Sequence, residues 1–347
     1  MAKIKDFIRN NQYTSILLGL LIAVLALFSV LKGSTFWQPN IWKGMTMQFP
    51  EYACVALGLM FVFISGHHDM SQVLLANFAS ILAVRYMAAN VVEGMSNGQV
   101  GGVIMVGIGI ALGIAVIGAL INFVLVSFLN VPPVMATIAM QMVWKGLSTA
   151  LTQGYAVKGV PALYTTIGHT YIGGFLAFPV VIFLVLLAIS IFLLKYTTFG
   201  EKLYMIGTNK KAAKFSGINV HAMLCATYLL SAIFATIGIL IMVNTMGSAK
   251  ADYGIDYTTR AILILVLAGC IPDGGLGKIS NILLSIVTVQ IIATGINLFG
   301  NLNTYYSSLI WGGMLIVVLI MSTQVGSGNV SKKIKAKKDS KASQKAA

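Results

Sequence analysis

The feature that most constrains this chain is a succession of long apolar runs with little polar sequence between them. Ten runs lie near residues 14–31, 49–65, 72–90, 101–129, 131–151, 172–195, 222–243, 258–271, 276–299 and 305–323. Most are long enough to cross a bilayer as an α-helix. With 58% hydrophobic and 9% charged residues, the 347-residue chain lacks the polar surface that a water-soluble domain needs. The sequence therefore predicts an all-α, polytopic integral membrane protein with about ten transmembrane helices, some of them short or broken.

The positions of the cations indicate how the helices are oriented. Three cations precede the first run and seven lysines lie in the last sixteen residues, within a formal net charge of +14. Cytoplasmic segments of membrane proteins are rich in lysine and arginine, and ten spans return the chain to its starting side, so we expect both termini to be cytoplasmic. Residues 1–326 are assigned to one transmembrane domain. Residues 327–347 are expected to form a basic, disordered cytoplasmic tail beside the lipid bilayer, rather than an arm that binds nucleic acid.

Two of the runs are too short or too broken to be plain spans. Residues 258–271 would reach only about 21 Å as a helix, whereas the hydrocarbon core is roughly 30 Å thick. The run 131–151 opens on Pro132 and Pro133. Such segments mark the translocation path of a transporter, because unpaired backbone is tolerated at membrane depth only where protein or water satisfies it. Tilted or re-entrant packing without a ligand is the other interpretation.

Each half of the chain also has a polar elbow between two runs. The first elbow comprises residues 65–72 and the second residues 269–277. They suggest an internal repeat, either parallel or inverted. His67, His68 and Asp69 suggest a metal site, but three adjacent side chains cannot all converge on one ion and no fourth ligand is visible. We therefore expect no metal site.

The longest polar stretch inside the chain is residues 197–220. We interpret it as an amphipathic helical hairpin outside the bilayer, in which Gly207 separates two helices, Thr208 caps the second helix and Gly217 turns the chain back. It carries four lysines: Lys202, Lys210, Lys211 and Lys214. A partner that held this hairpin could push or pull on the two spans that it connects. An ordinary lysine-rich cytoplasmic loop is the alternative.

This stretch resembles the cytoplasmic loop of the sugar-type permeases of ATP-binding-cassette importers, a family that includes the ribose, xylose and autoinducer-2 permeases. The matching residues are Gly200, Gly207, Asn209, Ala212, Ala213, Ser216, Gly217, Ile218 and Val220. In that family the loop docks on the ATPase subunit. The resemblance implies that residues 1–326 form a permease domain whose coupling loop lies at about 197–220. The residues that it assigns to ATPase coupling are Gly207, Asn209, Ala212, Ala213, Ser216 and Gly217.

The resemblance covers roughly residues 50–322. Its further matches are Asp69 and Ser71 in the first elbow, the Pro-rich segment 131–137, Lys145-Gly146-Leu147, residues 275–278 of the second elbow, residues 295–300 and Tyr305-Tyr306. One departure stands out. The family commonly has Glu-Leu-Asp after a Gly-x-x-Tyr motif. Here Gly254-Ile255-Asp256-Tyr257 is followed by Thr258-Thr259-Arg260, so a cation replaces an anion. A cation held deep in a membrane costs roughly 2.5 to 3.5 kcal/mol and is functional by default, although a cation near the membrane edge can also reach water.

Polar side chains within the apolar runs are candidates for the path of the solute. Amide and hydroxyl groups offer both donors and acceptors to an uncharged, polyhydroxylated molecule. The candidates are Asn77, Asn122, Thr137, Gln141, Asn244, Gln290 and Asn297. Each of them taken alone also fits a hydrogen bond between helices. Asp69 and Asp273 lie at elbows and Glu51 and Glu93 at predicted span edges, so we expect no carboxylate inside a span, which disfavours a proton-coupled carrier.

The sequence and its resemblance together predict a permease subunit of an ATP-binding-cassette importer in the bacterial cytoplasmic membrane. We expect it to translocate a monosaccharide or a similar small polar solute. The implied partners are a separate ATPase subunit, an extracytoplasmic solute-binding protein and a second permease, identical or different. The chain itself is expected to bind no cofactor, with ATP and magnesium held by the ATPase subunit.

Other functions remain open at this point. A self-contained secondary carrier would need no ATPase, and relatives of the family carry nucleosides, autoinducer-2 or branched-chain amino acids. An integral-membrane hydrolase is disfavoured because we find no converging polar triad. Gly277-Lys278 resembles the end of a P-loop, but Pro272 replaces the leading glycine and Ile279 the hydroxyl residue. We therefore expect a transport subunit and not an enzyme.

Overall fold

The computed structural model describes residues 12–271, 273–299, 306 and 308–320. Within them, seven helices are long and apolar enough to cross a membrane. These are α2 Gln12–Lys32, α3 Pro39–Ile64, α4 Gln72–Asn90, α5 Asn97–Ser127, α8 Phe178–Lys195, α11 Val220–Met246 and α13 Ile279–Asn297. Three further apolar helices fill the remaining predicted runs: α6 Pro133–Thr152, α12 Ile255–Leu267 and the helix Ser308–Ile320. The prediction of an all-α polytopic membrane protein is confirmed.

Shorter elements connect the long helices. They are η1 Gly33–Thr35, α7 Ala162–Gly168, β1 Tyr171–Ile172, β2 Leu176–Ala177, α9 Thr198–Thr208 and α10 Lys210–Phe215. The strands β1 and β2 pair antiparallel, with Tyr171 opposite Ala177. The predicted run 172–195 therefore becomes a helix only at Phe178. Pro179 occupies the first turn of α8, where a residue without a backbone N–H is tolerated because the first N–H groups of a helix have no intrahelical partner.

The start of α3 differs most from the prediction. The helix begins at Pro39, ten residues before the apolar run 49–65, and its first turns include Trp42 and Lys43. A helix continues as long as its backbone hydrogen bonds do, whereas hydropathy reports only how apolar each residue is. Consequently Glu51, predicted at a span edge, lies well inside α3 and is 3% exposed.

Helix α3 is the core of the structure. Every residue from Pro50 to Ile64 is buried, on all sides of the helix, as expected for a helix that is apolar all round and surrounded by others. Its closest neighbour is α11. A Cβ added at Gly58 would lie 2.8 Å from the carbonyl oxygen of Ser231, and one added at Gly238 would overlap the carbonyl oxygen of Glu51. Glycine thus lets the two backbones approach as small residues do in membrane helix pairs.

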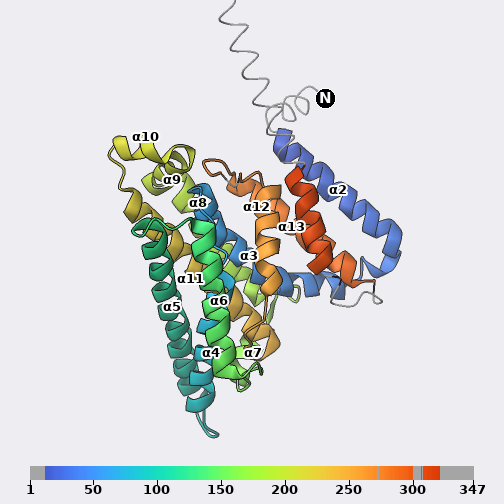
Figure 1. Ribbon diagram of the computed structural model, residues 1–347. Helices are drawn as coiled ribbons and strands as arrows, with labels where there is room; N and C mark the ends of the chain where they lie inside the picture. The colour runs from blue at the N-terminus through green and yellow to red at the C-terminus, as the bar shows by residue number, and fades with distance from the viewer. Residues whose placement is uncertain (1–11, 272, 300–305, 307, 321–347) are drawn as a thin grey trace, which may run out of the picture.

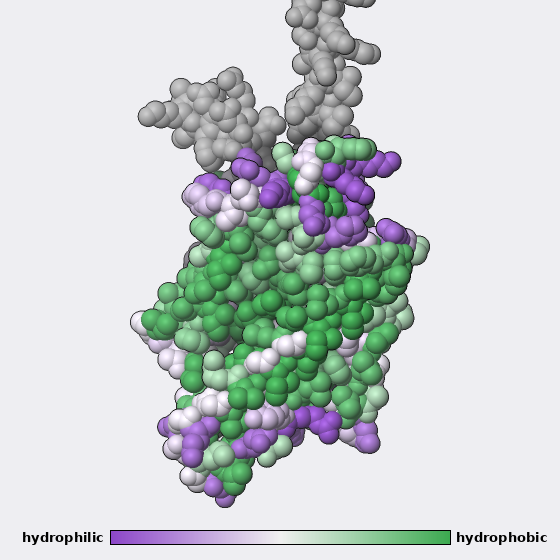
Figure 2. Space-filling model, turned by 90° about the vertical axis from the view of Figure 1, so that its left-hand side faces the viewer, coloured by the Kyte–Doolittle hydropathy of each residue, from purple (hydrophilic) through white to green (hydrophobic). Residues whose placement is uncertain are grey.

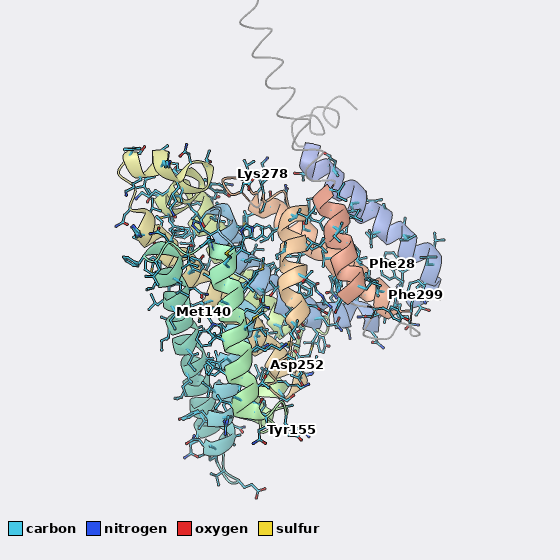
Figure 3. The ribbon with its side chains drawn as sticks, in the orientation of Figure 1. Phe28, Met140, Tyr155, Asp252, Lys278 and Phe299 are labelled. Atoms are coloured by element: carbon cyan, nitrogen blue, oxygen red, sulfur yellow. The ribbon has the colours of Figure 1, made fainter. Side chains whose placement is uncertain are left out.

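The outer surface fits a bilayer. Figure 2 shows a broad apolar band between two polar ends. Helices α5, α6 and α8 expose large apolar side chains, including Met105, Met142 and Phe192. In Figure 1, α9 and α10 lie at the same end of the molecule as the first turns of α2. Lys278 lies at this end as well, while Tyr155 lies toward the opposite end (Figure 3). The basic tail predicted at 327–347 lies outside the described residues.

Candidate functional site

The predicted hairpin is present as α9 and α10, but its details differ from the prediction. Gly207 does not separate the two helices, because α9 continues through it to Thr208. The cap of α10 is Asn209, whose side-chain oxygen accepts a hydrogen bond of 3.0 Å from the backbone nitrogen of Ala212. Thr208 instead donates its hydroxyl to the carbonyl oxygen of Tyr204 at 2.9 Å. The six-residue helix α10 therefore depends on Asn209 for its start.

Gly217 ends the hairpin as predicted. Its φ angle is +80°, and the turn around it is closed by a hydrogen bond of 3.1 Å from the nitrogen of Ile218 to the carbonyl oxygen of Ala213. This is the αL termination that glycine favours at a helix C-terminus. A Cβ at this position would meet no atom within 4 Å, so the requirement for glycine is conformational and not steric.

Gly207 has the opposite requirement. It lies in ordinary helix, but a Cβ there would overlap both the carbonyl oxygen of Ile64 and the backbone nitrogen of Gly275. The first atom belongs to the last residue of α3, directly before the first elbow, and the second atom belongs to the second elbow. The α9–α10 hairpin is therefore packed, backbone against backbone, on both elbows at once.

The two elbows also contact each other directly. The nitrogen of Gly275 donates to the carbonyl oxygen of Ile64 at 2.9 Å, and a Cβ on Gly274 would lie 2.5 Å from the backbone of Gly66. Positive φ angles of +77° at Gly66 and +87° at Gly274 shape these turns. Tyr204 of α9 adds a hydrogen bond of 2.7 Å from its hydroxyl to the carbonyl oxygen of Gly277. Sequence reasoning found both elbows without placing them together.

A groove of about 370 Å³ opens on the exposed side of the hairpin. Four of the six predicted coupling residues line it, beside Tyr204, Met205 and Thr208; they are Asn209, Ala212, Ala213 and Ser216. Gly207 and Gly217 do not line the groove and act on the backbone instead. Phe215, the last residue of α10, does not line the groove, but it is 92% exposed and was not identified from the sequence. A fully exposed aromatic ring is typical of a surface that a partner covers.

The histidines of the first elbow do not form a metal site. His67 is buried, and its Nδ1 lies 3.0 Å from the carbonyl oxygen of Ser65. Burial, with Lys210 close by, lowers the pKa of His67 to about 4. Asp69 accepts a hydrogen bond of 2.8 Å from the hydroxyl of Ser71. Among the described residues, no group of three His, Cys, Asp or Glu side chains could hold a metal ion.

The predicted pathway residues are not gathered at one place, and several hold the fold together. The side-chain nitrogen of Asn77 lies 2.6 Å from the carbonyl oxygen of Tyr253, which fixes the loop before α12. The side-chain nitrogen of Asn244 lies 2.6 Å from the carbonyl oxygen of Tyr164 and joins α11 to α7. For both asparagines the helix-packing interpretation fits the geometry.

Three other candidates lie near α6 and the first elbow. Thr137 is fully buried and donates to the carbonyl oxygen of Pro133 at 2.9 Å, the usual local bond of a threonine in a helix. Asn122 donates to the hydroxyl of Ser71 at 2.7 Å and supports the first elbow. Gln141 is partly exposed on α6. The structure does not bring these three side chains to the remaining candidates.

Gln290 and Asn297 belong together. They lie on one face of α13, with Thr294 between them, and the side-chain nitrogen of Gln290 donates to the Thr294 hydroxyl at 3.0 Å. Thr294 and Asn297 line a pocket of about 210 Å³, together with Gln48 of α3 and others. At the Gln290 end of this face, which we call the inner end, the hydroxyl of Tyr52 donates to the side-chain oxygen of Gln290. We call this row of polar groups along α3 and α13 the polar seam.

Sequence reasoning missed a charged cluster at the inner end of the polar seam. Glu51 of α3 accepts a hydrogen bond from the hydroxyl of Tyr257 on α12, and Arg260 lies near Glu51. The carbon Cζ of Arg260 is 4.5 Å from the ring centroid of Trp311 and 5.8 Å from that of Tyr52. The prediction that no span contains a carboxylate is therefore wrong, and it no longer argues against a proton-coupled carrier.

A bundle of apolar helices with a grooved polar hairpin at one end defines a multi-pass membrane transport protein. The chain belongs to the family described as branched-chain amino acid transport system / permease component, whose model matches residues 41–319. It is a permease subunit of an ATP-binding-cassette importer and resides in the bacterial inner membrane. The predicted family and transport role are thereby confirmed.

Curated relatives agree with this assignment. The chain is 28% identical over 318 residues to the autoinducer 2 import system permease protein LsrD of Yersinia enterocolitica, covering 90% of this chain and 92% of the relative. The proteins of the same name from Yersinia pseudotuberculosis and Yersinia pestis are 27% identical, with 90% and 91% covered. No solved structure matches the chain.

Proposed function

We propose that this permease translocates a small polar solute, a monosaccharide or a molecule of similar chemistry, driven by ATPase subunits that dock on the α9–α10 hairpin. A single observation carries the docking part. The hairpin has a groove and an exposed Phe215 on its outer side, while the backbone at Gly207 is packed on both elbows on its inner side. A displacement imposed on the outer side would therefore reach both elbows.

The elbows connect to four spans. The first joins α3 to α4 and the second joins α12 to α13, so movement of the hairpin would shift these helices relative to the rest of the bundle. In the proposed cycle, ATP binding closes the ATPase subunits, the hairpins move, and the path opens to one side of the membrane at a time. ATP and magnesium are held by the ATPase subunit, and this chain holds no cofactor. A solute-binding protein on the other side supplies the solute.

The remaining partner is a second permease, either another copy or a related chain. Autoinducer-2 is a candidate solute because the relatives named above import it, and nucleosides or branched-chain amino acids are alternatives. The buried Glu51 bears on the energy source, since self-contained secondary carriers use carboxylates at membrane depth, and the test therefore includes transport without ATP.

The docking proposal is tested by filling the groove. Wild-type protein and the variant Ala212→Trp are purified in mild detergent from native membranes, and copurified proteins are identified by mass spectrometry. Ala212 is exposed and lines the groove, so a tryptophan there occupies the space that a partner needs. We expect an ATPase subunit with the wild type, at least tenfold less with Ala212→Trp, and no change with the control Lys158→Trp, which is exposed outside the hairpin.

Two outcomes would contradict the proposal. A wild-type protein that emerges without an ATPase and moves solute into ATP-free liposomes would be a secondary carrier. An ATPase bound equally well to Ala212→Trp would place the docking surface elsewhere.

A further inference from the structure

Arg260 lies in a cage of aromatic rings at the inner end of the polar seam. Its guanidinium carbon is 4.5 Å from the ring centroid of Trp311, 5.6 Å from that of Tyr257 and 5.8 Å from that of Tyr52. All three distances fall within the range of cation–π attraction. The rings come from α3, α12 and the helix Ser308–Ile320, so three helices surround one cation.

The guanidinium of Arg260 and the nearby carboxylate of Glu51 differ in their hydrogen bonding. Glu51 accepts a hydrogen bond from the Tyr257 hydroxyl. The Nε of Arg260 is buried and has no hydrogen-bond partner, and no ion pair with Glu51 is found among the described residues. A guanidinium has five N–H donors, and an unmatched buried donor costs free energy. A purely structural ion pair would be expected to satisfy both charges, so this donor points to a ligand.

A row of polar groups leads to the aromatic cage from the C-terminal end of α13. The pocket of about 210 Å³ is lined by Gln48, Thr294 and Asn297. On α13, Gln290 and Thr294 are four residues apart, and on α3 the same spacing separates Gln48 from Tyr52, so each pair lies on one helix face. Amides and hydroxyls thus follow one another from the pocket to the ring of Tyr52, which borders Arg260.

We propose that Arg260 is a solute-contact residue, which determines specificity by donating N–H groups to the hydroxyl oxygens of an uncharged polyhydroxylated solute held beside the aromatic cage. The inference rests on the proposed function, because it assumes that the chain carries such a solute.

The composition of the polar seam favours a neutral ligand. Between the pocket and Arg260, its groups are amides and hydroxyls that both donate and accept hydrogen bonds. A solute with several hydroxyls can use both kinds of group, whereas an anionic group can only accept hydrogen bonds.

Trp311 provides a direct readout, because its ring contacts the Arg260 guanidinium. The full-length permease is reconstituted alone in lipid nanodiscs, and its tryptophan fluorescence is titrated with D-ribose and D-xylose as neutral probes. D-ribose 5-phosphate is the anionic comparison. We expect a saturable change with at least one neutral sugar, a loss of the change in Trp311→Phe, and no comparable response to the phosphate ester.

Variants of Arg260 separate solute contact from a structural role. Arg260→Met removes the donors, whereas Arg260→Lys keeps the positive charge but replaces the planar fork with a single ammonium group. We expect the sugar response to disappear in Arg260→Met and its affinity to fall at least tenfold in Arg260→Lys. The apparent melting temperature of Arg260→Lys should remain that of the wild type. The control Lys195→Gln alters a cation that also lies over a tyrosine ring, 5.3 Å from Tyr196, and should bind sugar normally.

Specific results would overturn the inference. The first is the absence of a saturable response of the wild type to either sugar up to about 100 mM, a concentration well above a millimolar Kd. The second is a stronger response to D-ribose 5-phosphate than to the neutral sugars. The third is sugar binding by Arg260→Lys with the affinity of the wild type. Because the titration uses no ATPase, its result is independent of the copurification experiment. Failure of docking and failure of solute contact are therefore distinguishable.

Discussion

The backbone nitrogen of Gly275 donates a hydrogen bond of 2.9 Å to the carbonyl oxygen of Ile64. These residues are more than two hundred positions apart in the sequence: Ile64 is the last residue of α3, and Gly275 lies in the turn between α12 and α13. Gly207 of the hairpin is packed against the same pair of atoms. The three segments therefore form one junction, in which the hairpin cannot move without displacing at least one elbow.

The variant Gly207→Ala should disrupt this junction. The new Cβ would overlap backbone atoms of both elbows, which cannot rotate away as a side chain can, and overpacking of this kind costs roughly 1 to 3 kcal/mol. We expect a lower apparent melting temperature and at least tenfold slower solute uptake at equal expression. Gly19→Ala is the control, since no atom lies within 4 Å of its Cβ. Normal uptake by Gly207→Ala would show that the hairpin is not packed on the elbows.

The cap of α10 makes a second prediction. Asn209→Ala removes the side-chain acceptor for the Ala212 nitrogen and should destabilise α10 by about 1 kcal/mol. Because the helix has only six residues, we expect its amide hydrogens to exchange several-fold faster in mass-spectrometric hydrogen exchange. The matched control is Asn219→Ala, which removes the equivalent cap of the 27-residue helix α11. Equal acceleration in both helices would contradict the prediction.

His67 predicts a dependence of stability on pH. Burial and the charge of Lys210 lower its pKa from 6.5 to about 4, so the folded state holds His67 neutral. Between these two pH values the unfolded state binds more protons, and the stabilisation is present above pH 6.5 and lost as the pH falls toward 4. The loss between pH 7 and pH 5 should be about 2 kcal/mol.

Apparent melting temperatures at both pH values measure this effect. Burial raises the pKa of Asp69, which acts with the opposite sign, and lowers that of His68. The difference between the wild type and His67→Asn isolates His67, since the other two groups remain in both. We expect a smaller acid-induced drop in His67→Asn and an unchanged drop in His169→Asn, whose histidine is exposed. An identical drop in all three proteins would refute the assignment.

The basic C-terminal segment makes a further prediction. Residues 327–347 are rich in lysine, serine and alanine and lack the apolar residues that a packed element needs. A protein truncated after Gly326 should therefore insert, copurify with its partners and take up solute at a rate close to that of the full chain. Loss of partner copurification on truncation would contradict this expectation and would give the segment a role in assembly.

The helices could be predicted from the sequence because their signal is local. A run such as 222–243 identifies α11 by hydropathy alone, and the glycine and lysine pattern of 197–220 identified the hairpin. The limits of α3 could not be predicted in this way. Its first turns are amphipathic, and their helical state depends on backbone hydrogen bonds that hydropathy does not report.

The contacts of the polar side chains could not be predicted because their partners are distant in the chain. The side chain of Asn77 bonds carbonyl groups more than 170 residues away, and nothing near Asn77 in the sequence distinguishes such a bond from a solute contact. Gln290 bonds Tyr52 of another helix as well as Thr294, and its role in a polar route stays a prediction. Arg260 stands out in the sequence as a cation inside an apolar run, but the three rings around it come from separate helices and could not be predicted.

Helix α12 has only thirteen residues, and Arg260 is the sixth. At 1.5 Å per residue, the backbone of Arg260 lies about 7.5 Å from the first residue of the helix and about 10.5 Å from the last, whereas the centre of a full-length span is about 15 Å from either surface. The hydrophobic barrier is therefore locally thin on both sides of this residue. A molecule held there would need to travel only a short distance to leave in either direction, and small helix movements could decide which direction is open.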